Sequence, residues 1–354
     1  MHRVAIIGCG RMGQQYAEAY TTYLDTEIVA IAEHNPERRE AVGRRFGVEA
    51  LYPDARSLLD DVVPDIAAIV TPSRFYKDAL IACVEAGVKG VSTDKPIAAV
   101  LSDADEMVEA CASRGVVFAG GNLQRAMSDI QEVAWMLRAG EFGEITGAAI
   151  HQWGNGEISG GGCQHVSVLR LLTSAEVTEV MAWATPEDLL DSGSDDGLKV
   201  NARFRMSTGV ECSVFSEPTP YQGADVWTAD SLVRWNWGQP ELYRGFEKNG
   251  ARKRLHHDYA PYEFSQFGYL TSSIRSFIAA VETGEELAVS GHDLRQALEV
   301  AIAARESARL GTVPVKLPLQ DRSLSLYPRP YRWSGGDTDG RPQPVAEALG
   351  GPRQ

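Results

Sequence analysis

The chain opens with a strand that leads into a glycine-rich loop and then into a helix. The run RVAIIG (3–8) is apolar and rich in β-branched residues, and GCGRMG (8–13) continues from it. In such a loop the first glycine permits a tight turn, the second lets a phosphate approach the main chain, and the third lets helix and strand pack closely. Free N–H groups at the helix start bind anions. The spacing therefore predicts a dinucleotide-binding site at Gly8, Gly10 and Gly13.

An acidic residue stands where a dinucleotide-binding unit needs one. Glu33 ends the second apolar run, 20 residues after Gly13. Its carboxylate can accept hydrogen bonds from the adenosine ribose hydroxyls and would repel a 2′-phosphate. We therefore expect NAD, with NADP less favoured, although Arg38 and Arg39 follow closely and could weaken the preference. The alternative is a glycine turn followed by a solvated glutamate.

The first third of the chain alternates apolar strands with helices. The strands are expected at residues 3–8, 27–33, 65–70, 88–92 and 115–120. Continuous apolar strands joined by helices indicate a parallel sheet that is covered on both faces. The predicted fold class is α/β, with a doubly wound parallel sheet of Rossmann type over residues 1–122. Ligands of such a sheet bind at the carboxyl ends of its strands.

After residue 122 the pattern changes to shorter strands with turn residues between them. The expected strands are 143–153, 177–185, 199–206, 209–218 and 232–238, and two helices follow at 264–284 and 291–311. This pattern predicts an α+β domain over residues 123–318 with a large, mostly antiparallel open sheet. Residues 319–354 are rich in Pro, Gly and Arg, and we expect an extended arm over a neighbouring subunit or a frayed tail.

The charge balance limits the partners. The chain has 34 basic and 48 acidic residues, a net charge of −14 with His neutral. That field repels phosphate backbones, so we expect no nucleic acid or membrane partner, whereas a cationic aminosugar would be tolerated. Scattered cysteines, histidines without metal-ligand spacing and the lack of an export signal indicate a cytoplasmic protein without a metal site. An apolar patch on the open sheet would favour a homodimer or homotetramer.

Two further loops follow central strands of the predicted parallel sheet. Thr71 and Pro72 follow the third strand, whereas Asp94, Lys95 and Pro96 follow the fourth. A lysine between an acid and a proline at this edge points toward the cofactor cleft. The alternative is a surface lysine before a turn.

In their order and spacing these segments resemble the glucose–fructose oxidoreductase/inositol dehydrogenase (Gfo/Idh/MocA) family. The resemblance extends to about residue 318. It is carried by IIGCGRMG, Glu33, TPSRFYKDAL, DKP in place of the usual EKP, GNLQR and GEFGEI. The stretch FIAAVETGEELAVSGHDLRQALEVAIAARESARLGTVPVKLP is similar to the family's closing pair of helices. The resemblance implies a Rossmann domain, an NAD cofactor and an oxidoreductase that acts on CH–OH groups.

The resemblance also assigns roles to single positions. It implies that the cofactor is bound by Gly8, Gly10, Arg11, Met12, Gly13, Glu33, Thr71, Pro72, Tyr76, Asp94, Lys95 and Asn122. It further implies that Lys95 and His165 are catalytic, and that Arg125 faces the nicotinamide or the substrate. The peptide before Pro96 is expected to be cis, as is frequent at this place in the family.

Two positions depart from the family's pattern. Tyr76 stands where the family usually has a histidine, which changes a cofactor contact. Gly161 stands where an aspartate commonly lies, one helical turn before the catalytic histidine that it orients. His165 must therefore be oriented by Gln164, by Glu157 or by a backbone carbonyl.

The chemistry of a secondary-alcohol dehydrogenase leaves two interpretations of the histidine. Such an enzyme removes the hydroxyl proton as hydride leaves, and it stabilises the developing alkoxide. An imidazole suits the proton and an ammonium suits the oxyanion. Either His165 is the base, or Lys95 or Tyr76 relays the proton and His165 only contacts substrate hydroxyls. Trp153 is either a wall on which a sugar ring stacks or a core residue.

Three functions follow from these features. The leading hypothesis is hydride transfer between NAD(P) and a sugar, cyclitol or sugar-containing metabolite. The second hypothesis is redox-assisted elimination or glycoside cleavage with tightly held NAD, which would give no net NADH. The third is a non-catalytic, dinucleotide-sensing regulator on the same scaffold.

Overall fold

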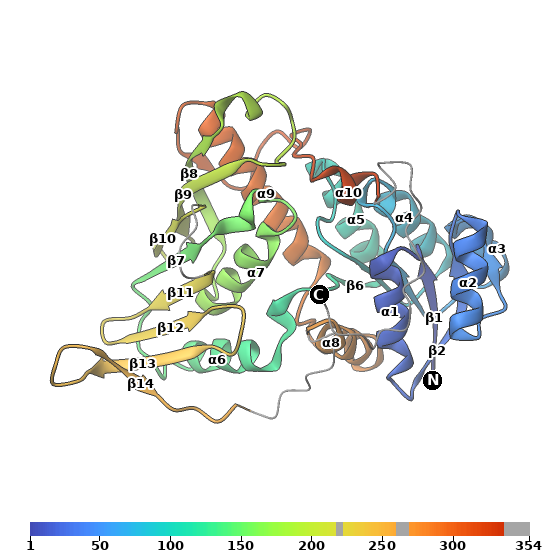
Figure 1. Ribbon diagram of the computed structural model, residues 1–354, viewed down its shortest axis with the longest axis horizontal. Helices are drawn as coiled ribbons and strands as arrows, with labels where there is room; N and C mark the ends of the chain where they lie inside the picture. The colour runs from blue at the N-terminus through green and yellow to red at the C-terminus, as the bar shows by residue number, and fades with distance from the viewer. Residues whose placement is uncertain (217–221, 260–268, 336–354) are drawn as a thin grey trace.

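The computed structural model describes residues 1–216, 222–259 and 269–335. These residues form two layered units side by side, each built on its own sheet (Figure 1). Among the described helices, none has the length and apolar composition that a membrane span needs.

The first unit is a parallel sheet of six strands in the order β3-β2-β1-β4-β5-β6, so the predicted doubly wound sheet is confirmed. Its strands are β1 (His2–Ile7), β2 (Thr26–Ala32), β3 (Leu51–Tyr52), β4 (Ile66–Ile69), β5 (Gly90–Thr93) and β6 (Val117–Ala119). The helices between them are α1 (Arg11–Thr21), α2 (Pro36–Phe46), α3 (Ala55–Asp61), α4 (Tyr76–Ala86) and α5 (Leu101–Arg114). The sequence pattern did not predict β3 and α3, because a two-residue strand leaves no apolar run.

Local signals account for the helix ends in this unit. The Asn35 side chain caps α2 by accepting a hydrogen bond from the Arg38 N–H at 2.9 Å, and Pro36 is the first helical residue. Gly47 ends the helix with a φ of 68°, in the left-handed region that favours glycine. These features fix where the chain leaves one strand and returns for the next.

The second unit is a sheet of nine strands in the order β14-β13-β12-β11-β7-β10-β9-β8-β15. It is mostly antiparallel, as predicted, with one parallel pair between β10 and β7. The strands are β7 (Gly147–His151), β8 (Val177–Thr185), β9 (Lys199–Met206), β10 (Glu211–Val214), β11 (Gly223–Trp227), β12 (Ser231–Trp235), β13 (Glu241–Phe246), β14 (Arg252–Leu255) and β15 (Val315–Lys316). β8 and β9 lie where the sequence predicts them, whereas β11, β13 and β14 were not expected.

Helices cover one face of this larger sheet. They are α6 (Ser128–Arg138), α7 (Gly162–Thr173) and α9 (Gly291–Arg309), of which α7 packs on β11 and α9 on β8 (Figure 1). α8 (Tyr269–Thr283) packs instead against α1 and β6 of the first unit, although its residues fall within the range expected for the second domain.

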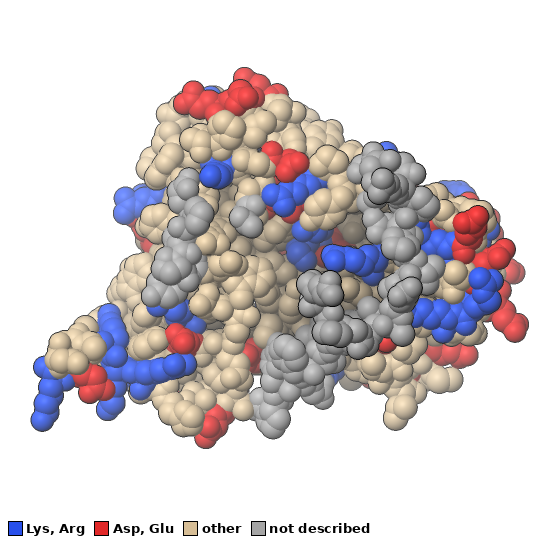
Figure 2. All heavy atoms as spheres, in the orientation of Figure 1, with Lys and Arg blue, Asp and Glu red and all other residues tan. Residues whose placement is uncertain are grey.

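The other face of the large sheet carries ion pairs, so among the described strands the large apolar patch expected there is interrupted by charges. Arg203 on β9 pairs with Glu211 on β10 at 3.0 Å, and Arg205 pairs with Glu179 on β8 at 3.2 Å. Trp183 on β8, which is 50% exposed, stands opposite Asn201 on β9, farther along the same strands. Lys and Arg side chains also gather on the tip of the β13–β14 hairpin (Figure 2). A dimer or tetramer through this sheet therefore stays a proposal.

The C-terminal arm, defined here as residues 319–335, packs against both units of its own chain. Arg322 pairs with Asp105 of α5 at 2.6 Å and with Glu299 of α9 at 2.5 Å. The Leu326 N–H then donates to the Ala99 carbonyl at 2.8 Å. The arm therefore connects the two units. The expectation of a frayed tail is wrong for this segment, and residues 336–354 lie outside the described residues.

Candidate active site

The glycine-rich loop has the geometry that the sequence predicts. Gly8 has a φ of 97°, and a Cβ there would lie 2.7 Å from the Thr71 nitrogen. A Cβ at Gly13 would lie 1.9 Å from the Gly8 carbonyl oxygen, so helix α1 can pack this closely only on a glycine. A Cβ at Gly10 would meet nothing within 4 Å. The start of α1 is thus open on the side from which a pyrophosphate would approach.

Glu33 is buried beside this loop, so the alternative of a solvated glutamate is wrong. Its carboxylate is 3% exposed and accepts a hydrogen bond from the Cys9 N–H at 2.8 Å. Its other oxygen accepts from the Asn35 N–H at 2.9 Å and lies 3.4 Å from Arg38 Nη1. Arg39 Nη1 donates to the Glu33 carbonyl at 2.7 Å. The acid is therefore held at the end of β2, with both arginines anchored to it.

Lys95 is largely buried and does not lie on the surface. It follows β5, its side chain is 11% exposed, and its peptide bond to Pro96 is cis, as expected. Its ammonium donates to the Asn122 carbonyl oxygen at 2.9 Å and lies 3.4 Å from Asp94 Oδ1. The cation is therefore fixed between the ends of β5 and β6.

The second unit reaches the same carbonyl from the other side. Gln164, near the start of α7, donates through Nε2 to the Asn122 oxygen at 3.3 Å. Its Oε1 accepts a hydrogen bond from the Gln124 N–H at 2.8 Å. Lys95 and Gln164 therefore donate to the same main-chain oxygen, although Lys95 follows a strand of the first unit and Gln164 lies on a helix of the second. Gln164 is next to His165 in the chain.

His165 is buried against two tryptophans. Its ring centroid lies 6.0 Å from that of Trp235 and 5.7 Å from that of Trp237, both in edge-on arrangements. Neither ring nitrogen has a hydrogen-bond partner among the described residues. Burial lowers the pKa of His165 to about 4, although the Gly161 carbonyl acts in the opposite direction. The imidazole is therefore neutral at neutral pH and able to accept a proton.

The structure narrows the choice of the group that orients His165. Gln164 is engaged by the Asn122 loop, and Glu157 pairs with Arg332 of the C-terminal arm at 2.7 Å. Of the three groups, the Gly161 carbonyl, one helical turn before the histidine, alone acts on the pKa of the imidazole, although neither ring nitrogen makes a hydrogen bond within the described residues.

Tyr76 lies close to Asp94 but is poorly suited to relay a proton. It is 4% exposed, and burial together with the charge of Asp94 raises the pKa of its phenol well above the usual value. Tyr16 donates to the same carboxylate at 3.5 Å. A phenol with a raised pKa stays protonated, which leaves Lys95 and His165 as the more suitable groups.

Trp153 packs in the core. It is fully buried, its Nε1 donates to the Gly162 carbonyl at 3.2 Å, and its ring meets that of Phe204 edge-on at 5.4 Å. Of the two interpretations from the sequence, these contacts support core packing and not a wall for a sugar ring.

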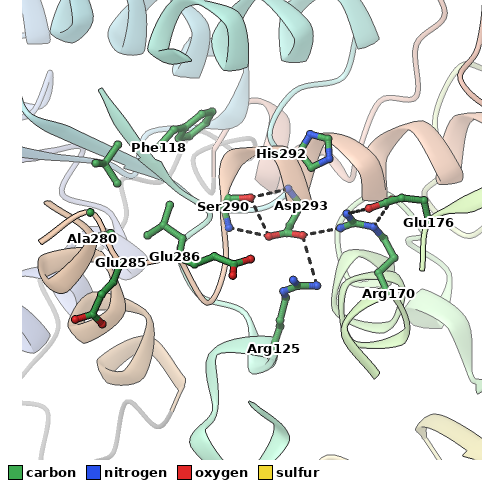
Figure 3. Close-up of a pocket in the computed structure, with 13 residues that line it drawn as sticks. Phe118, Arg125, Arg170, Glu176, Ala280, Glu285, Glu286, Ser290, His292 and Asp293 are labelled. Atoms are coloured by element: carbon green, nitrogen blue, oxygen red, sulfur yellow. Dashed lines mark hydrogen bonds and ion pairs between the residues drawn. The ribbon is translucent and has the colours of Figure 1, made fainter. Parts of the chain in front are cut away.

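Arg125 lines a pocket together with Arg170 and Asp293. Its Nε donates to the Ala288 carbonyl at 2.9 Å and its Nη1 to the Ser167 carbonyl at 3.0 Å. The pocket measures about 470 Å³, and in it Asp293 lies between Arg125 and Arg170 (Figure 3). These contacts join α7 to the start of α9, so they do not support the expected role at the nicotinamide or the substrate.

Several residues around the imidazole and the junction of the two units were not predicted from the sequence. Trp235 and Trp237 lie at the end of β12 and just beyond it, where the letters RWNWG indicated only a strand. Arg332 comes from the segment that was expected to lie elsewhere. His151, at the end of β7, pairs with Asp225 of β11 at 3.3 Å, and its charge adds to the burial that lowers the pKa of His165.

Comparisons with known proteins match this architecture. Residues 2–121 match the model of an oxidoreductase family with an NAD-binding Rossmann fold. A D-glucoside 3-dehydrogenase from Escherichia coli (strain K12) is 31% identical over 172 residues, which are 45% of this chain and 49% of that protein, so this alignment spans about half of the relative. A myo-inositol 2-dehydrogenase from Thermotoga maritima is 25% identical over 86% of this chain and 96% of its own.

A solved structure supports the same fold. The structure of a levoglucosan dehydrogenase in complex with NADH and levoglucosan superposes with a TM-score of 0.72 and 19% identity. It covers 90% of this chain and 100% of its own. At this identity the likeness concerns the fold alone.

Proposed function

The chain belongs to the Gfo/Idh/MocA family of oxidoreductases, and on this premise we propose that it transfers a hydride between NAD and a secondary alcohol or ketone. The substrate class that we propose is a sugar, a cyclitol or a sugar-containing metabolite, which includes aminosugars. The names of the relatives, which act on glucosides and inositol, support this class.

The observation that carries the proposal is the meeting of Lys95 and α7 on the Asn122 carbonyl, at the carboxyl ends of β5 and β6. The open glycine loop at Gly10 and the buried Glu33 fit a dinucleotide along the same edge of the sheet. Residues of the glycine loop would hold the diphosphate, Glu33 the adenosine ribose, and Thr71, Pro72, Tyr76, Asp94 and Asn122 the nicotinamide half.

When bound, NAD supplies the hydride acceptor or donor. The Lys95 ammonium is fixed in the cleft and stabilises negative charge on the substrate oxygen as the C–H bond breaks. The neutral His165 imidazole accepts the hydroxyl proton in the direction of oxidation and returns it in the direction of reduction. Trp235 and Trp237 keep water away from the imidazole, which holds it in its neutral form.

The preference for NAD over NADP rests on Glu33. A 2′-phosphate would have to lie beside a buried carboxylate, which disfavours it. Because Arg38 is drawn to the same carboxylate, its charge is less available to a phosphate.

A substrate panel tests the proposal. Purified protein is mixed with NAD and, in turn, with myo-inositol, levoglucosan, a methyl glucoside and glucosamine, while NADH absorbance is followed. Turnover on at least one of them, lost in both Lys95→Ala and His165→Ala, supports the enzyme. NAD binding without turnover on any compound would favour the regulator. Substrate cleavage without net NADH would favour the redox-assisted reaction.

A further inference from the structure

The C-terminal arm places an arginine, Arg332, where the two units meet. The last described helix of the arm, α10 (Pro330–Trp333), packs on the 3-10 turn η1 (Ser73–Phe75), which follows β4 and leads into α4. In Figure 1, α10 lies beside α4. The Ser73 hydroxyl donates to the Arg332 carbonyl at 3.1 Å, which fixes the main chain of the arm beside the Pro72 loop. The Arg332 side chain then turns to the second unit.

One nitrogen of that side chain is anchored and two are not. Arg332 Nε donates to Glu157 Oε1 at 2.7 Å, and Glu157 is itself 3% exposed at its side chain. Nη1 and Nη2 have no hydrogen-bond partner among the described residues, although the Arg332 side chain is only 23% exposed. Neither nitrogen is among the buried polar atoms, so both donors are open to a ligand that enters from solvent.

The surroundings place this guanidinium near the proposed reacting end of the cleft. Burial raises the pKa of the Cys163 thiol, and the charges of Lys95 and Arg332 both oppose that rise. Arg332 also acts on the pKa of Tyr76, and Asp94 acts on that of Arg332. The two cations therefore share neighbours on α7 and at the end of β5.

The glycines that precede α7 leave space for the ion pair between Glu157 and Arg332. A Cβ at Gly160 would lie 2.5 Å from the Glu157 carboxyl group and 2.8 Å from Arg332 Nε. A side chain at this position would therefore displace the guanidinium. The absence of a side chain at Gly160 is therefore required for Arg332, which lies far away in the sequence, to occupy this position.

We propose that Arg332 is a substrate-binding residue of this site. Glu157 holds the guanidinium by Nε, and Nη1 and Nη2 donate hydrogen bonds to hydroxyl oxygens of a polyol that stands beside Lys95. The planar fork of donors suits two neighbouring hydroxyl groups, such as those of a sugar or cyclitol. Because Glu157 balances the charge, a neutral polyol suits the pair better than an anion. This inference rests on the proposed function and names a further residue of the same site.

Three variants test it: Arg332→Ala, Arg332→Lys and the matched control Arg329→Ala. Arg329 is on the same arm and pairs with the exposed Asp196 at 2.9 Å. We expect Arg332→Ala to raise KM for the polyol roughly 10- to 100-fold, as the loss of charged hydrogen bonds implies, with NAD affinity unchanged. Arg332→Lys should recover part of the loss, and Arg329→Ala should leave KM within about twofold.

The readouts separate this inference from the proposed function. Turnover by the wild-type protein tests hydride transfer, whereas the ratio of the polyol KM to the NAD dissociation constant tests Arg332. If the wild type binds a compound of the panel without turnover, quenching of tryptophan fluorescence in the NAD-bound protein replaces KM. An equal effect of Arg329→Ala, a weakened NAD affinity with unchanged polyol affinity, or no polyol binding by the wild type would each overturn the inference.

Discussion

Lys95 and Gln164 donate hydrogen bonds to the same main-chain oxygen, that of Asn122, at 2.9 and 3.3 Å. Lys95 belongs to the parallel sheet and Gln164 to the helix that packs on the antiparallel sheet. The shared acceptor therefore fixes the distance between the two units at the place where the catalytic groups are proposed to lie. It also explains why His165, next to Gln164, has a defined position without an acidic partner.

The first prediction concerns Lys95. Lys95→Met keeps much of the side-chain volume and removes the charge, so negative charge on the substrate oxygen loses its stabilisation. We expect kcat to fall by about 10²- to 10³-fold, the usual effect of losing one donor to an oxyanion, whereas NAD affinity changes little. Steady-state kinetics and a titration with NAD measure the two quantities.

Lys89→Met is the matched control, because Lys89 pairs with Asp65 at 2.8 Å and its side chain is 65% exposed. It should be as active as the wild type. Full activity of Lys95→Met would contradict the role of the ammonium.

The glycine loop and Lys95 could be predicted from the sequence because their signals are local. A turn at Gly8 or a lysine at a strand end lies within a few residues of the strand that positions it. The partners of Glu157 could not be predicted, because Arg332 reaches it through a segment without periodicity. Trp237 was missed for a similar reason: it has a φ of 56° beyond the end of β12, where alternation no longer applies.

The triple glycine shows how an ambiguous signal is resolved by packing. From the sequence, the one conclusion about this segment was that position 161 lacks the orienting aspartate. In the structure a Cβ at Gly160 would meet Arg332, and a Cβ at Gly162 would lie 2.7 Å from Trp153 Nε1. Both neighbours are set by contacts between segments that are distant in sequence, so no local rule indicates them.

The second prediction concerns the proton acceptor. Because burial lowers the pKa of His165 to about 4, the imidazole is neutral over most of the acidic range. The kcat/KM for oxidation should therefore hold its value as pH falls and decline only as pH approaches that pKa. His165→Asn should lower kcat by about 10²- to 10⁴-fold and abolish this decline. The measurement is the pH dependence of kcat/KM in the wild type and in His165→Asn. An unchanged pH dependence in the variant would indicate that Lys95 relays the proton instead.

The third prediction concerns cofactor choice. Glu33→Ser removes the carboxylate that would repel a 2′-phosphate and leaves Arg38 without this partner. The ratio of kcat/KM for NAD to that for NADP should fall by roughly 10- to 100-fold, because a phosphate can then meet a guanidinium. Glu40→Ser is the control, since Glu40 is 65% exposed at its side chain and pairs with Arg44. Equal ratios in Glu33→Ser and the wild type would show that the acid does not select the cofactor.

The fourth prediction concerns stability in acid. The pKa of His165 is about 4 in the folded protein, against an ordinary value of 6.5. Between these values the unfolded chain binds a proton that the folded chain does not, so the free energy of unfolding decreases as pH falls from 6.5 toward 4. The largest loss is about 3 kcal/mol, at 1.36 kcal/mol for each pKa unit. His165→Asn has no such group and should lose less stability over the same range.

Urea unfolding near neutral pH and at about pH 5 measures this difference, because at the lower pH only part of the loss has occurred. His256→Asn is the matched control: the His256 side chain is 90% exposed, so its replacement should leave the pH dependence as it is in the wild type. A parallel fall in stability for the wild type and His165→Asn would mean that the folded protein takes up the proton at residue 165 as readily as the unfolded chain does. The imidazole would then be open to water, and the tryptophan pair could not be what keeps it neutral.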